Sequence, residues 1–265
     1  MKKRKLKWQV KFVLFIIALI VYSFTLGTKG IFIKEYKIET NNINKKLDGI
    51  KILQFSDLLF GSSTKRNTVK ELIKKINLAK PDIIIFSGGI LNNNYDIMGN
   101  DENFLINELS KTKAEVGKYY ITGNKNDKKY EDILIKSGFI SLDNNYEQLY
   151  QSISNPIVIL SKKNTNNYLS NNADFNGFKI LVLNNPKDFD DYKNNNFDMV
   201  ISGYTLNGQI YIPKLNKYII NSKYYKSYQK INNTKLYINN GIGTKHLPAR
   251  LFNHPTINLY RIYKK

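Results

Sequence analysis

Apolar positions divide the chain into one long uninterrupted run near its start and many short segments after it. Residues 12–26 (FVLFIIALIVYSFTL) carry no charge and follow a cluster of basic residues. A polar stretch rich in lysine and asparagine comes next, and beyond it apolar residues recur in short runs or at helical spacing. The pattern predicts three parts: a basic cluster with an apolar helix over 1–27, a polar tether over 28–46, and a globular domain over 47–265.

The globular part alternates predicted strands and helices, as layered α/β domains do. The apolar runs 50–55 and 82–87 are typical of buried strands. Between them, apolar residues recur at helical spacing over 68–79, which predicts an amphipathic helix that ends at Pro81. Helices dominate the first half and strands the second, which favours one domain with two sheets covered by helices. Further helices are predicted over 103–111 and 130–136, and further strands over 119–122, 157–160, 179–183, 199–202, 209–212, 236–239 and 257–263.

The apolar run near the N-terminus predicts a membrane anchor. Its 15 residues rise about 22 Å as a helix, and an extension back to Trp8, with Lys11 reaching the interface, brings it near the roughly 30 Å of a hydrocarbon core. The basic residues before the run predict a cytoplasmic N-terminus and an outward-facing domain, as in a single-pass protein of the cell membrane. A cleaved signal peptide is the alternative, with Val21 and Ser23 as the small residues before the cut.

The net charge and the cysteine content limit the partners and the kinds of site that the protein can have. The 265 residues carry a formal net charge of +20, which favours anionic partners. The lysines are scattered and form no basic stripe, so nucleic acid is not an expected partner. The chain has no cysteine, which excludes disulfides and thiolate metal sites. Neither a P-loop nor a GxSxG nucleophile turn is present, so candidate functional residues have to be sought in shorter sequence blocks.

Five such blocks stand at or just after predicted strands: SDLLFG over 56–61, FSGGI over 86–90, TGNKND over 122–127, LVLNNP over 181–186 and GYTLNGQ over 203–209. In order and form they resemble the D-x-H, G-D, G-N-H, lone H and G-H-x-H blocks of calcineurin-like metallophosphoesterases. The opening LDGIKILQFSDL and the closing GIGTKHLPAR resemble the membrane-anchored bacterial branch of that superfamily. The resemblance implies a four-layer α/β-β/α sandwich with an N-terminal transmembrane helix. In that family, two divalent ions such as Mn, Fe or Zn clamp a phosphate while a bound water attacks it.

The resemblance also implies where the metals were held, and most of those positions have changed. Asp57 and Asn124 match metal ligands of the family. Gly89 stands where the family has the aspartate that bridges both ions, and Asn184 stands where it has a histidine ligand. The other changed positions are Leu59, Tyr204 and Leu206, in place of histidine ligands, and Lys125, in place of the histidine that acts on the leaving group.

The histidine content gives an independent check. The family pattern requires five histidines across these blocks, whereas this chain contains only His246 and His254, both outside them. Each is interpreted as a surface or packing residue. No metal cofactor is therefore expected. Asp57 and Asn124 are of the residue types that bind metal in the family, but the other ligands of the family's site are not present beside them in the sequence blocks.

Three functions are compatible with these blocks. The first is a membrane-anchored pseudoenzyme that binds an anionic ligand, with Lys125 as the candidate anion contact, or an envelope protein. The second is a residual metal-dependent phosphohydrolase, a phosphodiesterase or phosphomonoesterase, with one metal held by Asp57, Asn124 and Asn184. The third is a protein-interaction module of an envelope complex that uses the sandwich as a passive platform.

Overall fold

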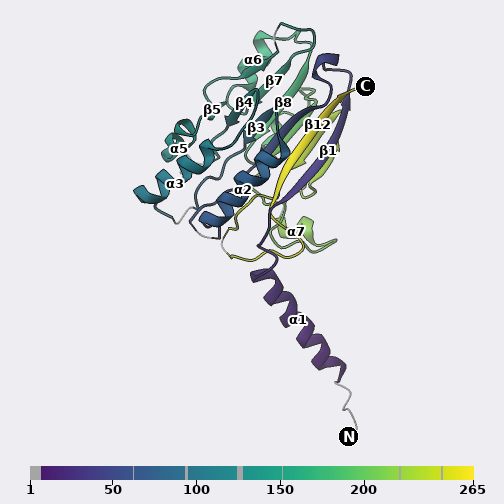
Figure 1. Ribbon diagram of the computed structural model, residues 1–265. Coiled ribbons are helices and arrows are strands. Elements are labelled where there is room, and N and C mark those ends of the chain that lie inside the picture. Colours follow the sequence, from purple (N-terminus) through teal and green to yellow (C-terminus); the bar gives the residue numbers. More distant parts are fainter. Residues whose placement is uncertain are drawn as a thin grey trace.

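The computed structural model describes residues 7–61, 63–92, 95–123, 128–150, 152–220, 222–245 and 247–265. A mixed α/β body carries one projecting helix (Figure 1). The helices are α1 (Trp8–Phe24), α2 (Arg66–Ala79), α3 (Gly99–Ser110), α5 (Glu131–Lys136), α6 (Thr165–Asn171) and α7 (Asn216–Ile220), with short 3-10 helices η1 (Lys45–Leu47) and η2 (Pro186–Asp191). The strands are β1 (Phe32–Thr40), β2 (Ile50–Phe55), β3 (Ile83–Phe86), β4 (Gly117–Tyr120), β5 (Ile140–Ser141), β6 (Glu147–Leu149), β7 (Ile157–Ser161), β8 (Phe178–Leu183), β9 (Met199–Ser202), β10 (Tyr228–Ile231), β11 (Thr234–Ile238) and β12 (Thr256–Lys264).

Two six-stranded sheets form the body. Their strand orders are β1-β12-β2-β3-β4-β5 and β10-β11-β9-β8-β7-β6. The pairs β12–β2, β10–β11 and β6–β7 are antiparallel, and the other neighbours are parallel. Two mostly parallel sheets in a mixed α/β chain fit the sandwich that the resemblance implies.

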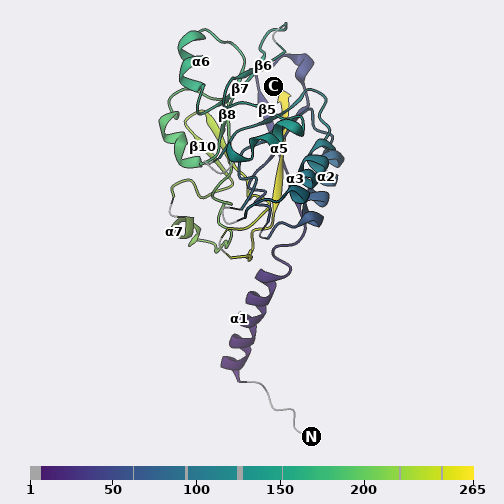
Figure 2. The same cartoon turned by 90° about the vertical axis from the view of Figure 1, so that its left-hand side faces the viewer.

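The central strands of each sheet are buried on both faces. Ile85 of β3 and Ile180 of β8 belong to one apolar cluster between the sheets, whereas their neighbours Ile84 and Leu181 belong to clusters on the outer faces. Helices α2, α3 and α5 lie on one side of the body and α6 lies on the other (Figure 2). Double-sided burial explains why these segments are continuous apolar runs in the sequence.

The first strand lies within the stretch predicted to be a polar tether. Residues Phe32–Thr40 form β1, which pairs in parallel with β12 from Phe32 opposite Thr256 to Thr40 opposite Lys264. Only Ile38 is fully buried along it, so β1 is an edge strand with a polar outer side. The sheet therefore begins before Leu47.

Helix α1 projects away from the body (Figures 1 and 2), and its large apolar side chains are mostly exposed. The helix predicted over 12–26 is present over Trp8–Phe24, and these 17 residues rise about 26 Å, against about 30 Å for a hydrocarbon core. In the part of the chain that the structure describes, no helix is long and apolar enough to cross a membrane. The transmembrane length predicted for this helix is thus not found.

Candidate functional site

Four of the five sequence blocks come together at one edge of the two sheets. Asp57 and Gly89 follow β2 and β3 of the first sheet, and Asn184 and Tyr204 follow β8 and β9 of the second. Because parallel strands end at the same edge, the loops after them share one end of the body. The described residues of these four blocks therefore lie at the same end of the body.

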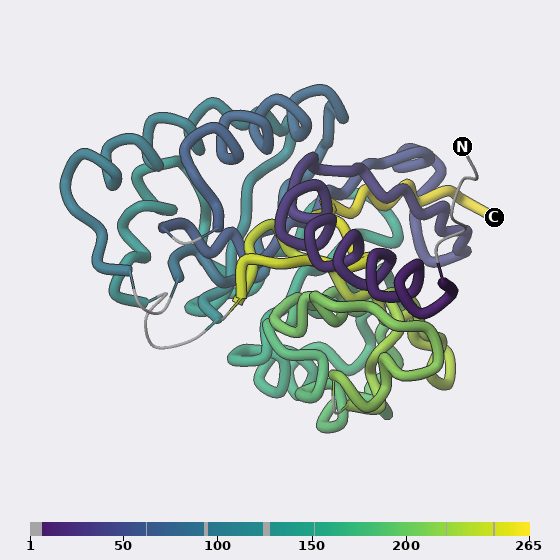
Figure 3. Tube along the Cα trace, turned by 90° about the horizontal axis from the view of Figure 1, so that it is seen from below, coloured from purple at the N-terminus to yellow at the C-terminus, as the bar shows by residue number. Residues whose placement is uncertain are grey.

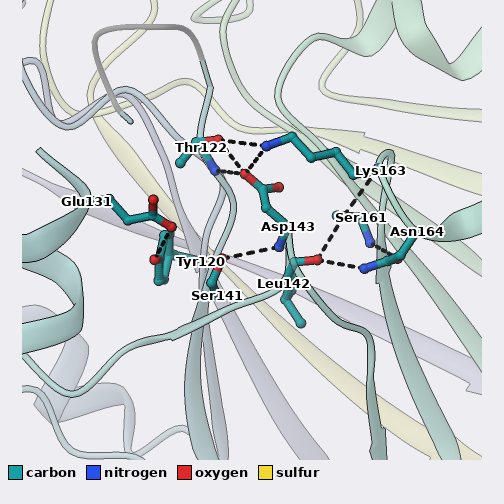
Figure 4. Close-up of polar contacts among 9 residues, drawn as sticks. All are labelled: Tyr120, Thr122, Glu131, Ser141, Leu142, Asp143, Ser161, Lys163 and Asn164. Atoms are coloured by element: carbon teal, nitrogen blue, oxygen red, sulfur yellow. Dashed lines mark hydrogen bonds and ion pairs between the residues drawn. The ribbon is translucent and has the colours of Figure 1, made fainter. Parts of the chain in front are cut away.

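The fifth block to be placed is TGNKND over 122–127. Its first residue, Thr122, belongs to a cluster of polar side chains between the two sheets (Figure 4). The backbone nitrogen of Thr122 donates to Asp143 Oδ2 at 3.0 Å, and its hydroxyl donates to the same oxygen. Lys163, which follows β7, pairs with that carboxylate at 2.9 Å. Sequence analysis missed Asp143 and Lys163, since only the folded sheets bring them to the block. Three predicted residues lie outside the described ones: Asn124, Lys125 and His246.

Hydrogen bonds join the blocks across the two sheets. Asn184 donates from Nδ2 to the backbone oxygen of Ser87 at 3.0 Å, and its own backbone oxygen accepts from Gly203 at 3.1 Å. The backbone nitrogen of Asp57 donates to Gly88 at 2.8 Å. The side-chain nitrogen of Asn184 therefore holds the second and fourth blocks together.

The carboxylate of Asp57 is held by donors from the protein itself. The residue is only 1 % exposed. Its Oδ2 accepts a hydrogen bond from Ser56 Oγ at 2.7 Å and another from the backbone nitrogen of Tyr204 at 2.8 Å. Both donors bind the same one of the two carboxylate oxygens.

A buried arginine lies behind this carboxylate. The guanidinium of Arg250 is wholly buried and donates to the backbone oxygens of Asn240, Gly241 and Gly243 at 2.9, 3.1 and 2.6 Å. Burial lowers the pKa of Arg250 to about 10, and the negative charge of Asp57 opposes that shift. Arg250 thus binds the closing loop together and places a positive charge near the old metal site. Nothing in the sequence around it signals this role.

A second cation covers the mouth of the site. Lys245 donates from Nζ to the backbone oxygen of Tyr204 at 2.5 Å, and the same nitrogen lies 3.4 Å from the centre of the Tyr204 ring. Burial lowers the pKa of Lys245, and the charge of Asp57 works against that effect. The position where the family has a histidine ligand therefore carries a tyrosine that is covered by a lysine.

The bridging position has no room for a carboxylate. Gly89 has φ +84°, in the left-handed region that side-chain-bearing residues rarely adopt. A Cβ at this position would lie 2.8 Å from Cα of Asp57 and 3.1 Å from its Oδ1. A side chain at position 89 would therefore require a strained backbone and a shift of Asp57.

Buried leucine side chains occupy two of the positions where the resemblance implies histidine ligands. Leu206 is 1 % exposed, and its Cδ2 lies 2.4 Å from where a Cβ of Gly241 would stand. Leu59 is 6 % exposed and lies against Gly243, whose added Cβ would stand 2.7 Å from the Cβ of Leu59. Apolar carbon thus occupies space that metal ligands hold in the family.

The described side chains at this end of the body do not fit a pair of divalent ions. Among the described residues, no group of three or more histidine, cysteine, aspartate or glutamate side chains is placed to hold a metal. The other histidine, His254, packs at the end of α1, with Nε2 3.0 Å from the hydroxyl of Tyr22. The packing role predicted for His254 is confirmed.

Two pockets lie elsewhere on the body. One of 730 Å³ is lined by Asn77, Lys80 and Lys118, at the end of the first sheet opposite to Asp57. A second, of 380 Å³, lies at the start of α2 beside Thr64 and Arg66. Neither of these two pockets is lined by a residue of the predicted metal site.

Sequence comparison places the chain beside proteins named metallophosphoesterases. It is 29% identical over 246 residues to the uncharacterized metallophosphoesterase YkuE of Bacillus subtilis, which covers 86% of this chain and 84% of that protein. It is 26% identical over 264 residues to the uncharacterized metallophosphoesterase Cj0846 of Campylobacter jejuni, with 94% and 67% covered. YkoQ of Bacillus subtilis, another uncharacterized metallophosphoesterase, is 24% identical over 257 residues, with 86% and 91% covered.

Two further comparisons add little. No family model matches the chain. Among solved structures, GAP50, the anchor in the inner membrane complex of Plasmodium, aligns with a TM-score of 0.40 at 11% identity over 78% of this chain and 76% of that one. That likeness is too low to bear on function. The curated relatives confirm the resemblance that the five blocks carry.

Proposed function

We propose that this chain, a homologue of the calcineurin-like metallophosphoesterases, no longer hydrolyses phosphate esters and acts as a membrane-attached binding protein. The relatives' names imply divalent metal ions in those proteins. In this chain the described positions that correspond to the metal site have been converted to hydrogen-bonded and apolar packing.

The observation that carries the proposal is the state of Asp57. In a two-metal site this carboxylate would offer its oxygens to an ion, and a second carboxylate would bridge to the neighbouring ion. Here its Oδ2 accepts two hydrogen bonds from the protein, and Gly89 leaves no space for the bridge. The remaining carboxylate is a structural group, buried among its own donors.

Attachment to a membrane through α1 is the second part of the proposal. Large apolar side chains along the helix are exposed, from Trp8 at 76 % to Phe24 at 48 %, which favours burial in lipid. The basic residues before the helix predict that the globular domain lies outside the cytoplasm. This topology is supported by the charge pattern alone.

An anionic ligand is the third part. The net charge of +20 and the placement of Arg250 and Lys245 around a single carboxylate favour an anion over a metal cation at this end of the body. Lys125, the contact predicted from the sequence, stays a candidate. An envelope protein as partner is the alternative occupant.

Metal content and turnover test the loss of hydrolysis. The full chain is purified in mild detergent, incubated with manganese, desalted, and assayed for bound metal and for cleavage of bis-p-nitrophenyl phosphate. We expect substoichiometric metal and the same background cleavage as in Asp57→Ala. One bound ion per chain, with cleavage that Asp57→Ala abolishes, would instead establish the single-metal phosphohydrolase.

A further inference from the structure

The end of the body from which α1 leaves carries exposed apolar side chains on two separate segments. The first segment includes α7, in which Tyr218 is 74 % exposed, and Leu215 just before α7, which is 51 % exposed. The second contains Leu247 at 61 % and Phe252 at 58 %. Single exposed apolar residues are ordinary, but a cluster at one end of a molecule marks an interaction surface. We call Ile212, Leu215, Tyr218, Ile219, Leu247 and Phe252 the apolar rim.

Hydrogen bonds join the two segments of the apolar rim. The backbone nitrogen of Tyr211 donates to Leu251 at 2.9 Å, and that of Leu251 donates to Gln209 at 3.2 Å. The side chain of Gln209 donates to the backbone oxygen of Leu247 at 2.5 Å. The rim is therefore one surface, and it belongs to the loops that close the former metal site.

Helix α1 is fixed to this same surface. The backbone nitrogen of Arg250 donates to Ser23 at 2.9 Å, and the ring of Tyr22 lies 6.4 Å from that of Phe252. Gly27 leaves no space for a side chain, because an added Cβ would stand 2.0 Å from the backbone oxygen of Arg250. Seen from below the body, α1 crosses over the loops of this end (Figure 3). When α1 enters a bilayer, the rim is carried to the bilayer surface with it.

The positive charge of these segments is complementary to an anionic surface. After Asp198 the chain contains no aspartate or glutamate to its last residue, Lys265. Lys214 and Lys217 flank Leu215 within the rim, and Lys29 lies on the short connection from α1 to β1. Basic side chains beside exposed aromatic and aliphatic ones are typical of surfaces that rest on anionic lipid headgroups.

We propose that the end of the body that carries the former metal site lies on an anionic lipid bilayer, with the apolar rim in the headgroup region and the neighbouring lysines on lipid phosphates. This inference rests on the membrane attachment proposed above. It adds that the domain is held against the bilayer, with Tyr204 and Lys245 facing lipid headgroups.

The chain offers a clean way to measure both contacts. It has no cysteine and a single tryptophan, Trp8 on α1. Tyr218→Cys and Leu247→Cys are each labelled with an NBD fluorophore in the full-length protein, which is reconstituted into phosphatidylcholine bilayers with or without phosphatidylglycerol. Leu78→Cys is the matched control, because Leu78 is 70 % exposed near the end of α2, at the opposite end of the sheet. Quenching by lipids spin-labelled in the headgroup reports NBD contact, and quenching by lipids brominated in the acyl chain reports insertion of Trp8.

We expect Trp8 quenching in both bilayers. NBD quenching at 218 and 247 should be at least twofold stronger in the anionic bilayer, with none at 78. In the Tyr218→Cys protein, Lys214→Gln with Lys217→Gln should remove most of the anionic enhancement. Trp8 quenching without NBD quenching at 218 and 247 would overturn the inference and leave the attachment intact. Absence of Trp8 quenching would overturn the attachment itself. A label at 218 or 247 that is shielded only after an envelope protein is added would assign the rim to a protein partner and refute the lipid contact.

Discussion

The structural role assigned to Asp57 predicts that removing its carboxylate unfolds the protein more readily. A carboxylate that serves only to bind a metal repels the other negative groups of the site when the metal is absent. Removal of such a carboxylate leaves the free energy of unfolding unchanged or raises it. In this chain the carboxylate accepts hydrogen bonds from Ser56 and Tyr204 and faces the positive charge of Arg250. Asp57→Ala should therefore destabilise the fold.

The size of the effect follows from these contacts. A hydrogen bond to a charged group contributes about 1.5–3 kcal/mol, and two are lost. The attraction between this carboxylate and the nearby buried charge of Arg250 is lost as well. The two contributions overlap, so we expect a loss of about 3–5 kcal/mol in the free energy of unfolding. Domains of this kind have about 5–15 kcal/mol in total, so the loss is easily measured.

Urea unfolding of the full chain in mild detergent, followed by circular dichroism, measures the change. Asp188→Ala is the matched control, since Asp188 forms an ion pair at 2.9 Å with the half-exposed Lys162. Exposed pairs contribute at most about 1 kcal/mol, so the control should unfold almost as the native chain does. An Asp57→Ala protein that is as stable as the native chain, or more stable, would refute a structural role for this carboxylate.

One further substitution and one pH series give separate tests of the structure. Gly89→Asp, which restores the family's bridging residue, should lower stability by about 3 kcal/mol or more, because it forces a Cβ to 2.8 Å from Asp57 at a left-handed φ. Gly99→Asp is its control, since nothing lies within 4 Å of the added Cβ. Thermal unfolding compares the two, and a Gly89→Asp protein that melts with the native chain would contradict the steric argument. Burial raises the pKa of Tyr119 and of Tyr168 to about 12, against about 10 in the unfolded chain, so stability present below pH 10 should be lost between pH 10 and 12. Urea midpoints at pH 9 and 11 measure this loss, Tyr119→Phe should reduce it, and an equal loss in that variant would count against the assignment.

Much of the body was predictable because its elements are encoded by local patterns. The strand predicted over 50–55 is β2, and the helix predicted over 68–79 is α2, which begins two residues earlier at Arg66. Both depend on the spacing of apolar residues, which short windows of sequence contain. The location of the site was predictable for a similar reason, since each block stands after a strand.

Long-range pairing was not predictable in the same way. Residues Phe32–Thr40 contain four charged side chains and read as a tether, yet they form β1 because β12 supplies a parallel partner more than 200 residues away. Conversely, the strand predicted over 209–212 contributes only an isolated bridge between Ile210 and Leu251. Whether an ambiguous segment becomes a strand depends on the edge that is available to it.

The backbone in the first and fifth sequence blocks shows how the loops at this end of the body are ordered. Leu59 and Leu206 have φ values of +46° and +52°, in the left-handed region, which costs a residue with a side chain about 1–2 kcal/mol. Strained backbone of this kind is common at functional sites, where ligand binding offsets the cost. Here the burial of each leucine, which contributes about 1.5–3 kcal/mol, offsets it instead. The loops at this end of the body are therefore ordered by apolar packing, by the hydrogen bonds of Arg250 and by those of Asp57.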